Sequence, residues 1–111
     1  MTANVLPLPT CKGLEMIPVN TIIRIEAISS YSKLHFVNGK TLVVAKVLAW
    51  FDTQLAGQGF LRTHRTHLVN RLYINRYVNG RGGRITLHNG DEIEVSKRKK
   101  NGFLQCWRAA A

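Results

Sequence analysis

Two Asn-Gly pairs constrain the fold of this chain more than any other feature of its sequence. Asn38-Gly39 and Asn89-Gly90 each stand between two short segments that are rich in β-branched residues. Asn-Gly is the strongest short-range hairpin signal, because hairpin turns need residues that accept a positive φ angle. Each pair therefore predicts two neighbouring antiparallel strands, with one hairpin in each half of the chain.

Short strands are predicted along most of the remaining sequence. Residues 22–28 alternate, so Ile23, Ile25 and Ala27 are expected on one side and charged residues on the other. Residues 10–13 have the composition of a turn. The further predicted strands cover residues 5–8, 14–17, 31–37, 40–45, 60–63, 74–78, 84–87 and 92–95.

Two stretches change to helical spacing. Apolar residues at positions 47, 48, 51 and 55 fall on one helix face, and glycines at 57 and 59 would end that helix. Ser96 is a suitable N-cap for a closing helix over residues 97–107, which would dock through Phe103, Leu104 and Trp107. The residues therefore predict a mainly β chain of the all-β class, with many short strands and two short helices. Neither helix has the character of a recognition helix, so loops are expected to carry any nucleic-acid contact.

The charge of the chain gives the first indication of a partner. Its 111 residues, enough for one domain, carry a net charge of +10, most of it on residues 60–111. A small domain this basic usually meets a polyanion, either nucleic acid or an anionic membrane surface. The alternative is a solvated basic face on a protein of any function.

The sequence shows no sign of export or of membrane insertion. No apolar run approaches the ~20 residues of a membrane span, and no charged start precedes an apolar stretch at the N-terminus. Cys11 and Cys106 are too few for a disulfide scaffold, so a reduced, cytoplasmic protein is expected. A single bridge between the two cysteines stays open.

No pattern of catalytic or metal-binding residues stands out. Glu92 and Glu94 would share a strand face, but bases flank their hairpin, and surface charge explains them without an active site. His64 and His67 lie close in sequence, whereas a structural zinc site needs about four ligands with paired spacings. We therefore expect no enzymatic activity, no metal and no cofactor.

Residues 60–71 form the most informative segment. They place Arg62, Arg65 and Arg71 among histidines and small hydroxyl side chains, while Leu68 and Val69 would anchor the segment. We interpret it as a basic loop that suits contact with phosphates and base edges.

The same segment resembles the F-x-R-x-H-R-[ST]-x-[LV]-V-N signature of the LytTR family of bacterial DNA-binding domains. The matching positions are Phe60, Arg62, His64, Arg65, Thr66, Leu68, Val69 and Asn70. Other motifs follow the family's order: I-E-A at residues 25–27, L-x-N-G at 87–90 and V-S-K-R at 95–98. The resemblance covers residues 14–107, with an N-terminal segment over 1–13 and a tail over 108–111.

The resemblance implies an elongated stack of short antiparallel sheets that reads duplex DNA through its loops. Three regions would contact two successive major grooves and the minor groove between them, on promoter direct repeats. By motif these regions lie around Tyr31, at Arg65 within the signature, and at Arg98. The expected DNA-binding residues are Tyr31, Ser32, Lys33, Arg62, His64, Arg65, Thr66, Asn70, Ser96, Lys97, Arg98, Lys99 and Lys100.

The chemistry of these side chains suits such contacts. Arg98 could pair with O6 and N7 of guanine, and Arg65 would respond to the negative potential of a narrow A·T-rich minor groove. Lys33 and the lysines of residues 97–100 are natural phosphate clamps. If six to eight phosphates are neutralised, the log-log dependence of affinity on salt should have a slope of about −5 to −7.

Structural alternatives stay open for several of these residues. Residues 97–100 could be only a solvated helix start, and Tyr31 could pack on the sheet. His64 could bond the backbone inside its loop, and Asn70 could be a structural brace. Other histidines, at 35 and 88, are expected in strands with a surface or cross-strand role.

We expect a transcription factor domain that is monomeric when free, with two copies meeting on a repeat. Members of the family that regulate transcription usually carry a receiver or membrane-sensor domain before the DNA-binding part. Two interpretations stay open: an isolated domain with a receiver or sensor partner, or a protein that stands alone without a phosphorylation switch. One competing prediction is a basic RNA-binding or ribosome-associated module, with Tyr31, Tyr73 and Tyr77 as its stacking aromatics. The other is a small hydrolase, which would need a convergent acid–base pair that we do not find.

Overall fold

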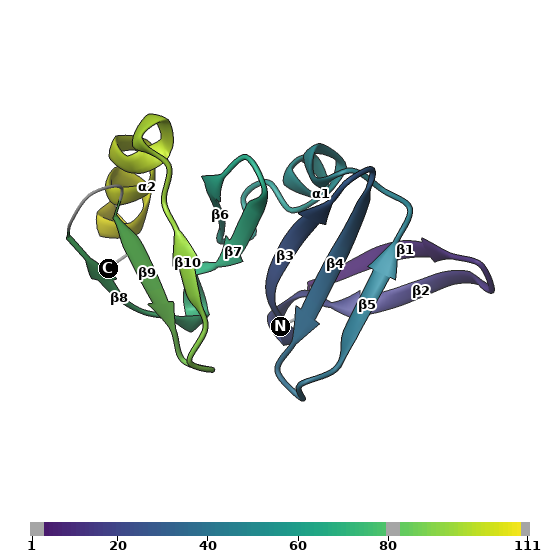
Figure 1. Cartoon of the computed structure of the whole chain (residues 1–111). Helices are drawn as coiled ribbons and strands as arrows, with labels where there is room; N and C mark the ends of the chain where they lie inside the picture. Colours follow the sequence, from purple (N-terminus) through teal and green to yellow (C-terminus); the bar gives the residue numbers. More distant parts are fainter. Residues whose placement is uncertain (1–3, 80–82, 110–111) are drawn as a thin grey trace.

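The structure, a computed structural model, describes residues 4–79 and 83–109. This part of the chain contains short β-strands, two α-helices and two 3₁₀ helices (Figure 1). The predicted mainly β class with two short helices is therefore confirmed. In chain order the elements are β1 (Val5–Thr10), β2 (Gly13–Pro18), η1 (Val19–Thr21), β3 (Ile22–Ile28), β4 (Tyr31–Phe36), β5 (Thr41–Val44), α1 (Leu48–Gln54), β6 (Phe60–His64), β7 (His67–Asn70), η2 (Arg71–Tyr73), β8 (Ile74–Val78), β9 (Arg84–Leu87), β10 (Glu92–Glu94) and α2 (Lys97–Ala109).

The strands pair into antiparallel sheets that lie side by side. A five-stranded sheet with the order β5-β4-β3-β7-β6 occupies the middle. The β1–β2 hairpin lies at one end of the molecule, and the β10-β9-β8 sheet with α2 lies at the other (Figure 1). The molecule measures 43 × 36 × 24 Å, so the elongated stack of short sheets that the resemblance implied is confirmed.

Asn38-Gly39 and Asn89-Gly90 form the predicted hairpin turns, which join β4 to β5 and β9 to β10. Gly39 and Gly90 have positive φ angles of 84° and 94°. Each glycine donates its N–H to the carbonyl three residues before it, at 3.0 and 2.9 Å. The side-chain oxygens of Asn38 and Asn89 accept from the backbone N–H two residues later. Asparagine thus closes the turn with its side chain while glycine takes the left-handed conformation.

The predicted strand over residues 60–63 is confirmed as β6, but residues 67–70, which we expected in a loop, form the strand β7. Arg65 and Thr66 are the turn between these two paired strands. The strand β7 pairs with β3, so Leu68 lies beside Ile25 in the middle of the central sheet. The sequence pattern missed β7 because Leu68 and Val69 are both buried, and two adjacent buried residues do not alternate.

The first core lies between the central sheet, the β1–β2 hairpin and α1. Phe51 of α1 is fully buried there, and Leu48 and Leu55 lie beside it. Val47, which we placed on the same helix face, is 51% exposed because it precedes the first helical turn with an extended backbone. The buried members of this core are Leu6, Leu8, Val19, Ile22, Ile25, Leu34, Val44, Leu48, Phe51, Leu55 and Leu68.

The second core lies between the central sheet, the three-stranded sheet and α2. Phe103 is buried, and Leu104 and Trp107 pack against the same cluster, as predicted for the docking face of the closing helix. The buried members of this core are Ile23, Val69, Ile74, Ile85, Leu87, Ile93, Val95 and Phe103.

Strands β3 and β7 supply side chains to both cores. Ile25 and Ala27 pack into the first core, but Ile23 is buried in the second, so the expectation that all three share one side is wrong. The cause is an irregularity in the β3–β4 pairing between Ile22 and Arg24, which turns Ile23 toward the other face.

A small polar network also crosses from the central sheet to the three-stranded sheet. Nε of Arg24 donates to Oδ2 of Asp91 at 3.0 Å, and the Arg24 side chain is only 12% exposed. Glu26 forms an ion pair with the same guanidinium, with Oε1 3.6 Å from Nη1 of Arg24, and the same carboxylate oxygen lies 3.1 Å from Nε2 of His35. The expected cross-strand role of His35 is confirmed, whereas His88 lies in a turn rather than in a strand.

The remaining expectations concern the cysteines, membrane-spanning helices and the turn predicted at residues 79–83. Cys11 is a free, exposed cysteine in the predicted turn between β1 and β2. Within the described residues, no helix has the length and apolar character needed to cross a membrane. The predicted loose turn at residues 79–83 lies largely outside the described residues.

Replacing Phe51 with alanine should lower the free energy of unfolding by about 3–5 kcal/mol, because it leaves a cavity in the first core. Urea denaturation measures this change. Val47→Ala is the matched control in the same helical segment and should change stability by less than about 0.5 kcal/mol. Equal losses for the two variants would contradict the assignment of the buried helix face.

Asp91→Asn should make the free energy of unfolding decrease less steeply as the pH is lowered. Burial alone would raise the pKa of Asp91, but hydrogen bonds from Arg24 and Asn89 hold that pKa below its ordinary value of 3.8. Its ionised form therefore stabilises the fold above the ordinary pKa, and this contribution is lost as the pH falls through the lowered folded value. Urea midpoints between about pH 2 and pH 6 should fall more steeply for the unmodified chain than for the variant. Parallel curves would show that the contact between the sheets contributes nothing.

Candidate nucleic-acid interface

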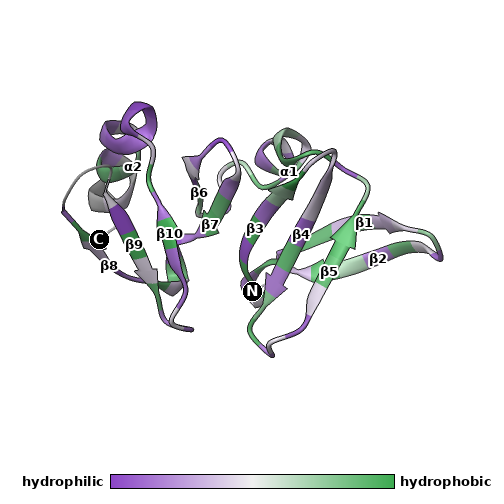
Figure 2. Cartoon of the chain, viewed as in Figure 1, coloured by the Kyte–Doolittle hydropathy of each residue, from purple (hydrophilic) through white to green (hydrophobic). Residues whose placement is uncertain are grey.

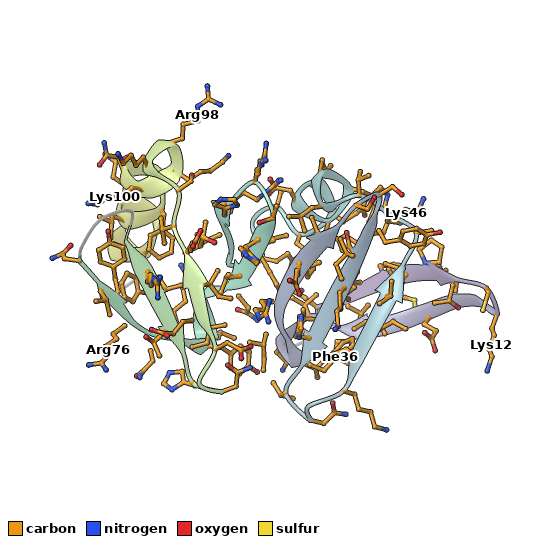
Figure 3. All side chains as sticks on the ribbon, in the orientation of Figure 1. Lys12, Phe36, Lys46, Arg76, Arg98 and Lys100 are labelled. Atoms are coloured by element: carbon orange, nitrogen blue, oxygen red, sulfur yellow. The ribbon has the colours of Figure 1, made fainter. Side chains whose placement is uncertain are left out.

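The three regions expected to contact DNA lie along one edge of the molecule. The turn between β3 and β4, the turn between β6 and β7, and the start of α2 all reach the upper edge in Figure 1. Arg98 projects from this edge, and Lys46 lies near its other end, whereas Arg76 lies on the opposite side (Figure 3). Segments that are far apart in the sequence thus form one polar rim.

Arg62 holds the β6–β7 turn from inside. Its guanidinium donates to the carbonyl oxygens of His64 at 3.0 Å and Arg65 at 2.6 Å. Its third contact is an ion pair of 3.1 Å with Asp52 of α1. The Arg62 side chain, expected as a DNA contact, is therefore committed to the turn and to the helix behind it.

His64 and Thr66 also stabilise the turn. Nδ1 of His64 lies 2.8 Å from Oγ1 of Thr66 and accepts a hydrogen bond from the Thr66 N–H at 3.2 Å. The Thr66 carbonyl accepts from the N–H of Ala27 in β3 at 2.9 Å. The alternative in which His64 bonds the backbone is what the structure shows, although the ring stays partly exposed.

Arg65 differs from its neighbours in this turn. Its side chain is exposed and forms no hydrogen bond or ion pair with the part of the chain that the structure describes. The bonds made by Arg62, His64 and Thr66 fix the backbone on both sides of it. A long cationic side chain is thus presented on a rigid two-residue turn.

The start of α2 is attached to this turn. The N–H of Ser96 donates to the carbonyl oxygen of Thr63 at 2.8 Å, which joins the helix to β6. The Ser96 hydroxyl accepts from the N–H of Lys99 at 3.2 Å, so the predicted N-cap is confirmed. This bond positions the first helical turn, where Lys97, Arg98 and Lys99 are exposed and Lys100 is half-buried. None of these four is in an ion pair with another described residue.

The β3–β4 region is only partly available for contact. Tyr31 is 48% exposed, which leaves part of its side chain available to a ligand, and Lys33 is half-buried beside Val43. Ser32 differs from the expectation, because its side chain is fully buried and its hydroxyl donates to the carbonyl oxygen of Lys46 at 2.6 Å. Ser32 thus supports the segment that leads from β5 to α1 and presents no group to a ligand.

Asn70 is a brace in the structure. It is 1% exposed, and its Nδ2 donates to the carbonyl oxygen of Ile22 at 3.0 Å. Its Oδ1 accepts from the N–H of Leu72 at 3.1 Å, which caps η2. The expectation that Asn70 contacts DNA is not compatible with this burial, and the structural alternative for this residue is the correct one.

The structure adds two basic residues that sequence reasoning did not place in the site. Arg84 lines a groove of about 220 Å³ together with His64, Ser96 and Lys97, and Glu94 lies at the same groove. Lys46 stands near the upper edge with its ammonium 5.3 Å from the Trp50 ring centre. Neither residue belongs to a recognised motif. Only the pairing of β9 with β10 brings Arg84 to the start of α2.

The residues considered for the two competing functions, RNA binding and hydrolysis, have other positions in the described part of the structure. Tyr73 and Tyr77 pack against the second core, which leaves only Tyr31 exposed among the three tyrosines proposed for stacking. Glu92 and Glu94 are exposed on β10, separated by the buried Ile93. Within the described residues, no three potential metal ligands gather.

Asn70→Ala should lower the free energy of unfolding by about 2–4 kcal/mol, because it leaves the buried carbonyl of Ile22 without a partner and removes the side-chain cap of η2. Urea denaturation gives this value. Asn75→Ala, at an exposed position of β8, is the control and should stay within about 0.5 kcal/mol of the unmodified chain. An Asn70→Ala chain of unchanged stability would refute the bracing role.

Comparisons with known proteins identify the family and the fold. The LytTR family model, described as the LytTr DNA-binding domain, matches residues 12–108. Among solved structures, the chain is similar to the LytTr DNA-binding domain of a Bacillus cereus protein that is named as a methyl-accepting/DNA response regulator. The two share 21% identity over 96% of this chain and 97% of the other, with a TM-score of 0.78. No curated protein is similar enough to match. The structural likeness establishes the fold, and the family match over nearly the whole length shows that the chain belongs to the LytTR family of DNA-binding domains.

Proposed function

We propose that this chain binds duplex DNA sequence-specifically, as the DNA-binding domain of a bacterial transcriptional regulator acting in the cytoplasm. The observation that carries the proposal is the rim formed by the β3–β4 turn, the β6–β7 turn and the start of α2. This rim presents exposed cations from regions far apart in the sequence, notably Arg65 and Arg98. The chain as a whole has a net charge of +10, which favours association with a polyanion.

The size of the molecule suits binding across more than one groove. Its longest dimension is 43 Å, which exceeds the ~34 Å of one helical turn of duplex DNA. In the proposed complex, Arg98 enters one major groove, Arg65 enters the adjacent minor groove, and Tyr31 and Lys33 reach the next major groove. The start of α2 is polar, as Figure 2 shows, and supplies phosphate contacts through its lysines.

The residues of the proposed interface fall into three groups with different roles. Arg65, Arg98 and Tyr31 are exposed and face the DNA in this arrangement. Lys33, Lys97, Lys99, Lys100 and Arg84 supply phosphate contacts. Arg62, His64, Thr66 and Ser96 hold the backbone of the turns, and the partly exposed His64 ring can also contact a phosphate.

The arrangement on a promoter follows from the resemblance and not from the geometry. We infer that the chain is monomeric when free and that two copies bind a pair of direct repeats. A receiver or sensor partner would then control its action, in keeping with the response-regulator name of the Bacillus cereus protein. We assign no reaction to the chain, because the LytTR family is one of DNA-binding domains.

Selection of a randomised duplex library at ~200 mM salt tests this function, since such salt weakens contacts that depend only on phosphates. We expect enrichment of a short element, repeated at about one helical turn. Retention of DNA without any enriched sequence would contradict sequence-specific binding. Preferential retention of a single-stranded RNA pool offered in parallel would favour the RNA-binding alternative.

Arg98→Ala should relax base preference, because a bidentate contact with guanine discriminates by about 1–3 kcal/mol. The ratio of affinities for the selected and a scrambled duplex should fall by about 5- to 100-fold. Arg76→Ala removes the same charge from the opposite side of the molecule and should leave the ratio unchanged. Equal weakening of Arg98→Ala on both duplexes would show that Arg98 contacts only the backbone.

Lys99→Ala should reduce the steepness of the salt dependence by about one unit, from a slope between about −5 and −7, because one phosphate contact is lost. Base preference should not change. Lys12→Ala, at the tip of the β1–β2 hairpin, is the control and should keep the original slope. A Lys99→Ala slope equal to that of the unmodified chain would exclude the proposed phosphate contact.

A further inference from the structure

The β1–β2 hairpin carries an exposed face made only of apolar residues. Cross-strand pairing places Val5 beside Pro18, Pro7 beside Met16, and Pro9 beside Leu14. Because alternate residues of a strand share a face, these six side chains lie together. All six are exposed, and Leu14 and Met16 reach 64% and 56%. Figure 2 shows hydrophobic colour on part of each strand of the hairpin.

This face is not needed to complete the fold. The opposite face of the hairpin already fills the first core with Leu6 and Leu8, which are 2% and 0% exposed. A hairpin that covers a core on one side normally carries polar residues on the other, since that side meets water. A contiguous exposed apolar patch instead marks a surface that binds another molecule.

The prolines determine how a partner could approach. Pro7 and Pro9 lie in β1, which is an edge strand, and neither has a backbone N–H to offer to an added strand. Pairing of another strand along this edge is therefore hindered. This hindrance at β1 favours a partner that packs its side chains against the flat face of the hairpin.

The distribution of charge indicates which partner fits. Residues 4–18 hold one basic and one acidic side chain, Lys12 and Glu15, so the hairpin is neutral on a chain of net charge +10. The hairpin also lies at the far end from α2, which carries Arg98 and Lys100 (Figure 3). Another copy of the chain can approach this end with little repulsion, and both basic rims stay free.

We propose that the apolar face of the β1–β2 hairpin binds the same face of a second copy of this chain. The face offers the six residues of these three pairs, far fewer than the roughly 20–30 that each partner contributes to a standard stable interface. The dimer is therefore weak, and the chain is monomeric at low concentration. Its two members are related by a two-fold axis, because both use the same patch.

Two-fold pairing has a consequence for DNA that rests on the proposed function. Copies bound to direct repeats follow one another in the same orientation, so their hairpin faces cannot meet. The dimer would instead join chains on inverted elements or on separate DNA segments.

Sedimentation equilibrium of the chain without DNA tests the proposal. Loading concentrations from about 10 μM to about 1 mM, at ~300 mM salt to screen the net charge, cover the range expected for a weak interface. We expect a monomer–dimer equilibrium whose dissociation constant rises at least about 10-fold in Met16→Glu, because each dimer would bury two unpaired carboxylates. Leu14→Glu should act in the same way.

Val78→Glu is the matched control, since Val78 is 43% exposed and lies in β8, at the other end of the molecule from this face (Figure 1). It should dimerise like the unmodified chain, and unchanged urea midpoints for the three variants would show that the fold is intact. A monomer at every concentration would overturn the proposal, and the apolar face would then be expected to bind a different protein. A dimer that survives Met16→Glu and Leu14→Glu would place the interface elsewhere. Because no DNA is present, either failure leaves the proposed DNA binding unaffected.

Discussion

Adjacent buried residues that enter opposite cores are the constraint on which the rest of this structure depends. In β7, Leu68 packs into the first core and Val69 into the second, and both are fully buried. The irregularity in β3 allows Ile22 and Ile23 to do the same. These two strands form a wall that separates the two cores and contributes side chains to both. If the elements that cover either core moved away from this wall, the residues that point into that core would be exposed to water. The ion pair between Arg24 and Asp91 adds a polar contact to the same junction.

The shared wall explains how short turns can act as a binding surface. The β6–β7 hairpin is fixed between the cores, and its turn is stiffened by the bonds of Arg62 to two carbonyl oxygens. The bond from Ser96 to Thr63 then attaches the start of α2 to the same hairpin. Much of the signature segment therefore serves to position a few side chains. Supporting residues of this kind favour binding, because a side chain that is held in place beforehand loses less conformational entropy when the DNA binds.

Local signals in the sequence predicted most of the fold. Asn-Gly turns and β-branched alternation located the hairpins, and Ser96 marked the start of α2. The pattern failed at β7 and at Ile23, where neighbouring residues face different cores, because alternation assumes one buried face per strand. For the site, motif matching identified the right segments but could not separate contact from support. The burial of Ser32 and Asn70 depends on partners 14 and 48 residues away, and the position of Arg84 depends on strand pairing.

The central claim is that one rim of turns, held by a wall shared between two cores, meets the DNA. Titration of the ¹⁵N-labelled chain with its selected duplex, followed by amide chemical shifts in NMR spectra, tests it most directly. The account predicts that the largest shifts fall at residues 29–33, 64–67 and 96–100, with small shifts at the turns of 38–39 and 89–90 on the opposite edge. Large shifts confined to that opposite edge, or to the face of the β1–β2 hairpin, would contradict it.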